Sequence, residues 1–382
     1  MTDNLKTKKR ALVIGGSLGG LFAASMLRQA GWEVDIFERS PHDLDSRGGG
    51  IVLQPEVVEL MRDSGIERHW DSLGVRSEQR IFYRPDGSVE HIQATPQIQT
   101  SWSLIYSVMR STISEAHYHK GRVLADIEYP DARHVTAIFE DGGRETGDIL
   151  VGADGNSSRV RQLLWQEQPE YAGYIAWRGL VPEDEMTVLA RQMLHGDFAF
   201  ASNAGSHILG YLVPGTDNDL RLGRRFYNWV WYRVVDDGLR ERIMTGADGI
   251  SRNYSVPEGL LRPEWKAHLQ QEANEMLPPG FRDIVHATKE PFAQAIRDLA
   301  VNSMVKGRVI LLGDAASIPR PHTAASTSKA AGNALALKNA LMQFPHDTDK
   351  ALAIWEREEV FRGKYLREMG TRIGNRLLFG RT

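Results

Sequence analysis

A glycine-rich turn near the start of the chain, Gly15-Gly16-Ser17-Leu18-Gly19-Gly20, has the residue types that bind a dinucleotide. Such a turn brings backbone N–H groups and the N-terminus of the next helix to a pyrophosphate. Glu38 ends the following strand-like run and suits the ribose hydroxyls. Ser17 replaces the usual middle glycine, so its Cβ must point away from the phosphate. A plain strand–turn–helix connection is the alternative, and the turn alone does not distinguish FAD from NAD.

Two later aspartates follow strand-like runs beside small residues. Leu150-Val151-Gly152-Ala153-Asp154-Gly155 precedes Ser158 and Arg161, and residues 309–312 run into Gly313-Asp314-Ala315-Ala316. An aspartate at a strand end suits a second ribose or a ribityl chain, whose hydroxyls need an acceptor. Each segment alone is equally compatible with a loop in which the aspartate caps a helix. All three motifs together, in this order, favour FAD.

The elements that must position these motifs are short strands that alternate with helices. A β-α-β unit with parallel strands is predicted first, and a strand-rich stretch later in the chain predicts a separate sheet. Strands are predicted at 11–14, 33–37, 308–312, within 177–231, in a hairpin over 80–93, and as strand, turn and strand over 135–151; helices are predicted at 21–30, 57–64, 324–341 and 349–369.

Composition bounds the class of protein. The 382 residues favour two domains, and the net charge of -3 gives no reason to expect nucleic acid or a membrane surface as partner. The chain has no cysteine, which excludes disulfides and thiolate chemistry and fits a reducing cytoplasm. No apolar run approaches the roughly 20 residues of a spanning helix. His117 and His119 lack a third ligand nearby, so we expect a solvated pair and no metal site.

The three motifs resemble those of the class A, single-component FAD-dependent aromatic hydroxylases, the para-hydroxybenzoate hydroxylase family, from about residue 10 to 365. The resemblance implies a Rossmann-like FAD-binding domain of the GR2 type, an inserted β-sheet substrate domain and C-terminal helices. It also implies tightly bound FAD, with NADH or NADPH as a transient co-substrate. The residues expected to bind the cofactor are Gly15, Ser17, Leu18, Gly20, Glu38, Arg39, Gly50, Asp154, Gly313, Asp314, Pro321, Ala325, Ser326 and Thr327.

Three further segments resemble the 2,6-dihydroxypyridine 3-hydroxylase branch of this family and its relatives in hydroxypyridine breakdown. They are Gly49 to Glu56, Tyr171 to Gly179, and Pro319-Arg320-Pro321-His322. The chain also departs from the family pattern. Tyr106, with Arg110 one turn on, stands where an arginine usually contacts the flavin; the usual Gly-Gln-Gly-like run reads Ala324-Ala325-Ser326-Thr327-Ser328; and Gly332-Asn333 replaces a Glu-Asp pair.

The family chemistry implies that NAD(P)H reduces the flavin, which reacts with O2 at C4a to give a hydroperoxide that hydroxylates an electron-rich ring. A base or acceptor near the ring hydroxyl helps, and water must be excluded. We expect His322, near an ordinary pKa of about 6.5, to take the proton and Tyr211 to bond a ring hydroxyl. Both have core-packing alternatives. Gln54 and Arg178 are further candidates for substrate contact, and Trp229 and Trp231 are expected on the opposite strand face from Tyr232.

Two other functions stay open at this point. One is an NAD(P)-dependent dehydrogenase or reductase, and the other is a non-catalytic flavin-binding protein. The expected partners are a small aromatic substrate and O2, with a homodimer left open. The expected domains are a discontinuous FAD-binding domain (1–80, 100–174 and 290–345), a substrate-binding sheet domain (81–99 and 175–289) and a C-terminal helical segment (346–382).

Overall fold

The computed structural model describes residues 8–44, 49–66, 72–194 and 196–381. Its first sheet has 6 strands, of which β18, β10, β1, β2 and β6 run parallel and β17 pairs antiparallel with β18. The strand sequences are short and apolar because helices and strands cover both faces. In sheet order the strands are β17 (Val305–Lys306), β18 (Val309–Leu311), β10 (Ile149–Gly152), β1 (Arg10–Ile14), β2 (Glu33–Glu38) and β6 (Tyr118–Lys120).

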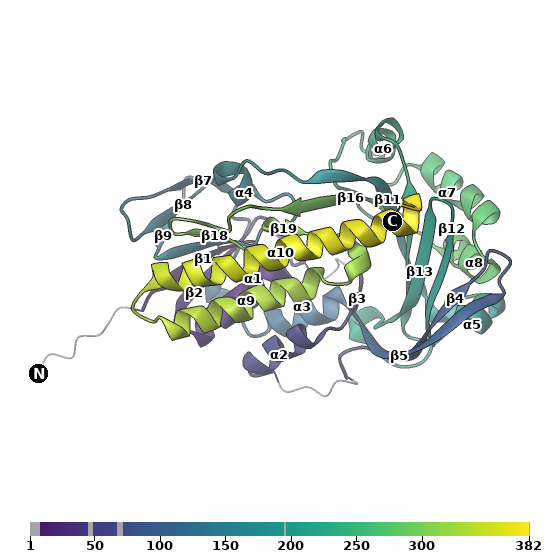
Figure 1. The fold of residues 1–382 in the computed structure, drawn as a ribbon, viewed down its shortest axis with the longest axis horizontal. Coiled ribbons are helices and arrows are strands. Elements are labelled where there is room, and N and C mark those ends of the chain that lie inside the picture. Colours follow the sequence, from purple (N-terminus) through teal and green to yellow (C-terminus); the bar gives the residue numbers. More distant parts are fainter. Residues whose placement is uncertain (1–7, 45–48, 67–71, 195, 382) are drawn as a thin grey trace, which may run out of the picture.

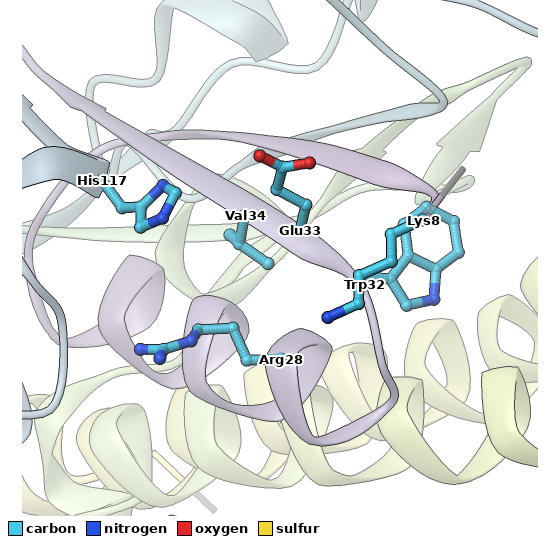
Figure 2. A pocket seen from close by; sticks show the side chains of 6 residues that line it. All are labelled: Lys8, Arg28, Trp32, Glu33, Val34 and His117. Atoms are coloured by element: carbon cyan, nitrogen blue, oxygen red, sulfur yellow. The ribbon is translucent and has the colours of Figure 1, made fainter. Parts of the chain in front are cut away.

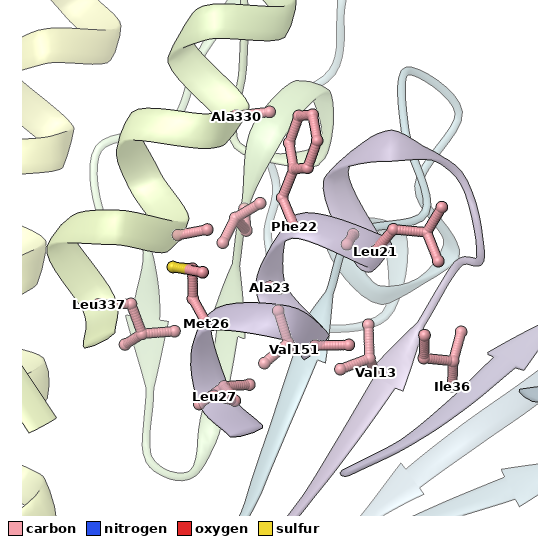
Figure 3. Packing of buried hydrophobic residues seen from close by; sticks show 14 of the residues in the cluster. Val13, Leu21, Phe22, Ala23, Met26, Leu27, Ile36, Val151, Ala330 and Leu337 are labelled. Carbon is pink, nitrogen blue, oxygen red and sulfur yellow. The ribbon is translucent and has the colours of Figure 1, made fainter. Parts of the chain in front are cut away.

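Helices pack on this sheet and on one another to form the larger core (Figures 1 and 3). Phe22 and Met26 of α1 lie between Val151 of the sheet and Ala330 and Leu337 of α9 (Figure 3). The predicted β-α-β unit is therefore present. The helices of this layer are α1 (Leu18–Gln29), α2 (Pro55–Asp63), α3 (Trp102–Arg110), α9 (Ser326–Gln343) and the long α10 (Thr348–Phe379), with α4 (Arg159–Leu164) after β10.

The strand–turn–strand predicted over 135–151 divides between two sheets. Residues 135–139 pair with β9, whereas the last strand of the prediction is β10 and belongs to the parallel sheet. The tight turn at Asp141 to Gly143 therefore closes a separate small antiparallel sheet. Its strands are β7 (Leu124–Glu128), β8 (Val135–Phe139) and β9 (Arg144–Gly147).

The second large sheet has 10 strands and is mostly antiparallel (Figure 1). The predicted hairpin is present as β4 and β5, which extend beyond the predicted bounds. In order across this second sheet, the strands are β15 (Ser255–Val256), β16 (Phe292–Ala300), β11 (Glu170–Pro182), β14 (Phe226–Val234), β13 (Ser206–Val213), β12 (Phe198–Asn203), β4 (Val75–Tyr83), β5 (Val89–Ser101) and β3 (Gly50–Val52), with β19 (Ser317–Ile318) beside β16.

The two faces of the second sheet differ in what covers them. Trp177, Trp229 and Trp231 lie on one face, in a core covered by α5 (Val188–Leu194), α6 (Asp237–Ile243), α7 (Pro263–Met276) and α8 (Pro279–Ala287). Tyr232 lies on the other face, as strand alternation predicted. α10 runs from α9 to β13 and β14 and so joins the two sheets (Figure 1). The domain bounds stay a prediction, since this sheet takes strands from several separate segments.

Short 3-10 turns complete the described fold. Two of them carry motif residues, at Gly313–Ala315 and Pro321–Thr323, and the others are Glu115–His117, Glu183–Glu185 and Thr216–Asn218. Among the described helices, none is both long and apolar enough to cross a membrane.

Candidate active site

The glycine turn after β1 is closely packed, and three of its glycines have no room for a side chain; a Cβ on Gly16 would lie 2.2 Å from the Tyr118 hydroxyl. Gly15 has φ +107°, and a Cβ on it would lie 2.6 Å from the Ala153 carbonyl oxygen. A Cβ on Gly20 would lie 1.8 Å from the Gly15 carbonyl oxygen. Gly19 differs, because its nearest neighbour would be 3.8 Å away. The turn thus brings bare backbone to the start of α1, as a phosphate cradle requires.

Glu38 braces this turn from β2. Its Oε2 accepts the Gly16 N–H at 2.7 Å and its Oε1 accepts the Ser40 N–H at 2.8 Å. Ser17 occupies the N-cap position of α1 with an extended backbone and makes no side-chain capping bond, and Leu18 begins the helix. Arg39 follows Glu38 and is exposed. The fit to a dinucleotide is good, since each carboxylate oxygen of Glu38 keeps a lone pair for a ribose hydroxyl.

Asp154 lies at the start of α4. Its carboxylate accepts hydrogen bonds from the Ser158 hydroxyl and from the backbone N–H groups of Arg159 and Val160. Burial raises the pKa of Asp154, while these bonds act to lower it. Asp154 thus bonds the first turn of α4, whereas the N-cap residue itself is Ser158. Its contact with the cofactor stays a prediction.

Asp314 is held differently, in the loop after β18. Its Oδ1 accepts the Ser326 hydroxyl at 2.7 Å and the Lys329 ammonium at 3.1 Å. Gly313 donates its N–H to the Asn333 side-chain oxygen at 3.1 Å, and the Asn333 amide donates to buried Glu359. Asn333, which departs from the family pattern, thus has a clear structural role behind this loop.

The three strand-end loops, which follow β1, β10 and β18, meet at one edge of the parallel sheet. β10 pairs with β1 on one side and with β18 on the other. Arg161 lies buried between the two later loops and donates to the carbonyls of Asn156 and Ala315; burial lowers its pKa, and the charges of Asp154 and Asp314 oppose that shift. The convergence that the motifs predicted is therefore present at the edge of a parallel sheet where nucleotides bind in such folds.

The loop from Pro321 to Ala325 leads from the last strand into α9. Ala324 has φ +51°, a left-handed conformation that a non-glycine residue adopts at a cost. α9 begins at Ser326, two residues later than predicted, because this turn interrupts the helix. The first amides of a helix lack acceptors within it, and the N-cap residue Ala325 has no polar side chain to accept from them. The amides at Ser326 and Thr327 are thus available to an electronegative ring edge.

His322 is part of an aromatic group rather than a free base. Its Nε2 lies 2.9 Å from the Tyr174 hydroxyl, and the Tyr232 ring is 4.6 Å away. Burial, with help from His207 and Arg320, lowers the pKa of His322 to about 3. The expectation of an ordinary pKa near 6.5 is therefore wrong. His322 is neutral at pH 7 and can exchange hydrogen bonds, but it is a weak base.

His207 was missed by sequence reasoning. It lies on β13, bonds the Ser202 hydroxyl at 2.7 Å and stacks with Tyr232 and Phe200. Burial lowers its pKa to about 4. The signal available was its spacing from Tyr211, since residues four apart on a strand share a face.

We call the face of the second sheet that carries these rings the aromatic face; it comprises Tyr174, Phe198, Phe200, His207, Tyr211 and Tyr232. Tyr211 is buried there, and burial raises its pKa to about 12. Gly50 packs so closely that a Cβ would lie 2.5 Å from the Tyr211 ring, and its N–H donates to Asn228 at 3.0 Å. Gly50, the first residue of β3, thus packs against the aromatic face, and its contact with the cofactor stays a prediction.

Arg178 lies at the border of the aromatic face. It donates to the Gln294 side chain at 3.0 Å and approaches Gly49. None of the described carboxylates forms an ion pair with it within 4 Å. Neither of its two predicted roles, binding substrate or bracing the flavin domain, is tested by these contacts. Gln54 only precedes α2 as its N-cap residue.

His117 and His119 are not simply solvated. Both rings lie within hydrogen-bonding distance of Asp35 Oδ1, at 2.9 and 3.3 Å, and Arg10 bonds the other oxygen. Asp35 lies within β2 and not at the strand end that carries Glu38. The described residues contain no cluster of three or more side chains suited to a metal ion.

Tyr106, at the departure from the family pattern, is buried beside Tyr118, with 3.3 Å between their hydroxyls. Arg110 stacks over the Tyr118 ring at 4.0 Å, and Tyr118 donates to the Gly16 carbonyl. This stack supports the glycine turn from behind. The missing arginine is therefore replaced by a packed tyrosine pair.

A separate surface hollow lies near the end of α1 and the start of β2 (Figure 2). It is lined by Lys8, Arg28, Trp32, Glu33, Val34 and His117. Arg28 lies in the last turn of α1 and Glu33 begins β2, so the hollow is remote from the strand-end loops. It has no part in the site described above.

Comparison with known proteins agrees with this geometry. A family model described as "FAD binding domain-like" matches residues 171–298. The chain is 33% identical to 2,6-dihydroxypyridine 3-monooxygenase of Paenarthrobacter nicotinovorans over 98% of this chain and 93% of that protein. It is 26% identical to 6-hydroxynicotinate 3-monooxygenase of Pseudomonas fluorescens, covering 91% and 86% of the two chains.

A solved structure gives the same result. That of 2,6-dihydroxypyridine-3-hydroxylase from Arthrobacter nicotinovorans superposes with a TM-score of 0.92 at 32% identity, over 98% of this chain and 94% of that one. These similarities decide against a dehydrogenase and against a non-catalytic flavin carrier. This chain belongs to the class A FAD-dependent aromatic-ring monooxygenases, which hydroxylate their substrates with NAD(P)H and O2.

Proposed function

We propose that this monooxygenase hydroxylates a hydroxypyridine, with a ring of the size and acidity of 2,6-dihydroxypyridine. The observation that carries the proposal is the aromatic face, where His207, Tyr211 and His322 place three neutral polar groups among stacked rings. A flat heteroaromatic ring is bound well by such walls. The names of the relatives, two of which act on hydroxypyridines, support the same substrate class.

The strand-end loops are proposed to hold FAD. The glycine turn with Ser17 and Leu18 would receive the pyrophosphate, Glu38 and Arg39 the adenosine ribose, and Asp314 the ribityl chain. Asp154, Gly313, Pro321, Ala325, Ser326 and Thr327 would line the remaining path toward Gly50. FAD, once bound, accepts the electrons of NAD(P)H and activates O2, and the protein contributes binding, orientation and exclusion of water.

The residues of the aromatic face are proposed to act on the ring hydroxyl. Because burial raises the pKa of Tyr211 to about 12, its hydroxyl stays protonated at neutral pH and can donate to a ring oxygen. Because burial lowers the pKa of His322 to about 3, its ring stays neutral and can accept a hydrogen bond. Such a donor and acceptor pair orients and polarises the ring hydroxyl, and neither residue takes up its proton at neutral pH.

The remaining parts of the proposal concern organisation and location. We keep the division into FAD-binding segments (1–80, 100–174 and 290–345), sheet domain (81–99 and 175–289) and C-terminal helical segment (346–382). The absence of cysteine supports a reducing compartment, and the cytoplasm is the proposed location.

A substrate panel tests this proposal. Hydroxypyridines, hydroxybenzoates and purines would be offered to the FAD-loaded enzyme, and O2 consumption coupled to NAD(P)H loss would be scored. We expect hydroxypyridines to give the highest kcat/KM. Tyr211→Phe and His322→Ala should each lower turnover about 10²-fold or more with FAD still bound. His134→Ala, at an exposed histidine on β8's edge, is the control. Full turnover in His322→Ala would refute its assignment.

A further inference from the structure

A lysine lies buried beneath the loop that carries Asp314. Lys329 is in the first turn of α9, a helix of 18 residues, and its side chain has 0% exposure. Its ammonium donates to Asp314 Oδ1 at 3.1 Å and also to the Ser317 carbonyl. A fully buried lysine is rare because burying its charge is costly unless the charge is paired. The fold therefore keeps a buried charge at Lys329 despite the cost of desolvating it.

The two oxygens of Asp314 are used unequally. Oδ1 accepts both the Lys329 ammonium and the Ser326 hydroxyl. Among the described residues, none donates to Oδ2, and the side chain is 33% exposed. One oxygen is thus fixed by two donors of α9, and the other is left to accept a hydrogen bond from a ligand. An aspartate anchored in this way loses little rotational freedom when it binds a hydroxyl.

The charge of Lys329 also balances that of Asp314. Burial lowers the pKa of Lys329, while the adjacent carboxylate raises it. The pair presents almost no net charge as long as both groups are ionised. Without the lysine, Asp314 would lose its ion-pair partner and keep only the nearby charge of Arg161, and its repulsion of another anion would be weakly screened in this half-buried position.

We propose that Lys329 is a positioning residue that aims Asp314 at the cofactor and cancels its charge, so that the negatively charged, reduced form of FAD is not repelled. This inference rests on the proposed function, in which Asp314 faces the ribityl chain. It predicts that Lys329 influences the affinity for FAD and the flavin reduction potential separately.

Three variants test it: Lys329→Met, Asp314→Asn, and both together. We expect Lys329→Met to weaken FAD binding at least tenfold, and reduced FAD about tenfold more than oxidised FAD. That difference is about 30 mV toward negative potential for a two-electron couple. Asp314→Asn should shift the potential the opposite way, and the double variant should return near the wild-type potential while still binding FAD weakly. Lys338 lies further along α9 and forms an ion pair with Asp63. Lys338→Met removes that pair and is the control, which should change neither the FAD affinity nor the reduction potential.

Affinity would be read by fluorescence titration of apoprotein and potential by dye-coupled reduction. A Lys329→Met protein with wild-type affinity and potential would overturn the inference, as would shifts of the same sign in Lys329→Met and Asp314→Asn. If Lys329→Met does not fold, Asp314→Asn alone decides, since an unchanged potential there would refute the charge argument. Failure of wild-type protein to bind FAD would instead refute the proposed function.

Discussion

The strand-end loops and the aromatic face solve two binding problems by different means. At the strand-end loops, the backbone makes the site: Gly15 and Gly20 leave room, and the start of α9 presents N–H groups. At the aromatic face, side chains make the site, and they come from β11, β12, β13 and β14 and from the loop at His322. The difference indicates that the first region tolerates almost no added atom, whereas the second can change its chemistry by substitution.

The most damaging substitution should therefore be a single methyl group at the first region. Gly20→Ala would place a Cβ 1.8 Å from the Gly15 carbonyl oxygen, so the turn must open and FAD binding should be lost. Gly19→Ala is the matched control, with 3.8 Å of clearance, and should bind FAD normally. Absorbance near 450 nm after gel filtration measures both. Normal flavin content in Gly20→Ala would contradict the account of the cradle.

Neighbouring residues on β14 separate the two faces of the second sheet. Trp231 is fully buried in the helix-covered core, so Trp231→Ala should lower the free energy of unfolding by about 3–5 kcal/mol. Tyr232→Phe, on the aromatic face, should change stability by far less but lower turnover. Urea unfolding and kcat/KM measured on both variants give the comparison. The reverse pattern would show that the two faces have been assigned the wrong way round.

The pH dependence of stability should report the buried histidines. Burial lowers the pKa of His207 to about 4 in the folded protein, against about 6.5 in the unfolded chain. Protonation therefore favours the unfolded state, and this stabilisation is present above pH 6.5 and lost as the pH falls toward 4.

The loss from His207 alone amounts to about 3 kcal/mol over that window. His207→Gln should flatten part of the slope in unfolding free energy, whereas His134→Gln at an exposed site should not. An unchanged slope in His207→Gln would mean that this histidine is not desolvated in solution.

The smallest effect concerns the loop between the two regions. Ala324→Gly should relieve the left-handed strain at φ +51° and raise stability by about 1 kcal/mol. Ala325→Gly, one residue on at φ -102°, has no such strain to relieve and should lower stability slightly. Thermal unfolding of the two variants distinguishes them. Equal destabilisation by both would argue against the left-handed turn.

The comparison also explains how far the sequence could predict the structure. The strand ends at Gly15, Asp154 and Asp314 were predictable because local patterns specify both the strand and its terminal residue. The tyrosine pair of Tyr106 and Tyr118 was not, since it depends on how α3 packs against β6, which local patterns do not specify. The contact of His207 with His322 was not predictable either, because it depends on how the turn at Pro321–Thr323 packs against β13.

Helix α10 shows a further limit. Its predicted end at residue 369 precedes Gly370, and glycine lowers helix propensity. The helix nevertheless continues to Phe379, because Gly370 and Gly374 allow close packing. A Cβ on Gly370 would lie 2.9 Å from the Arg320 backbone nitrogen, and one on Gly374 would lie 2.8 Å from the Tyr174 hydroxyl. Tertiary contact with the site loop thus outweighs local preference, which sequence patterns do not reveal.

The central claim is that the strand-end loops hold a flavin that delivers oxygen to a ring on the aromatic face. Turnover of 2,6-dihydroxypyridine by the FAD-loaded enzyme under ¹⁸O2, with the product analysed by mass spectrometry, tests it most directly. We predict one labelled oxygen atom in the product for each NAD(P)H consumed. An unlabelled product, or NAD(P)H oxidation that yields only hydrogen peroxide with every hydroxypyridine, would contradict the account.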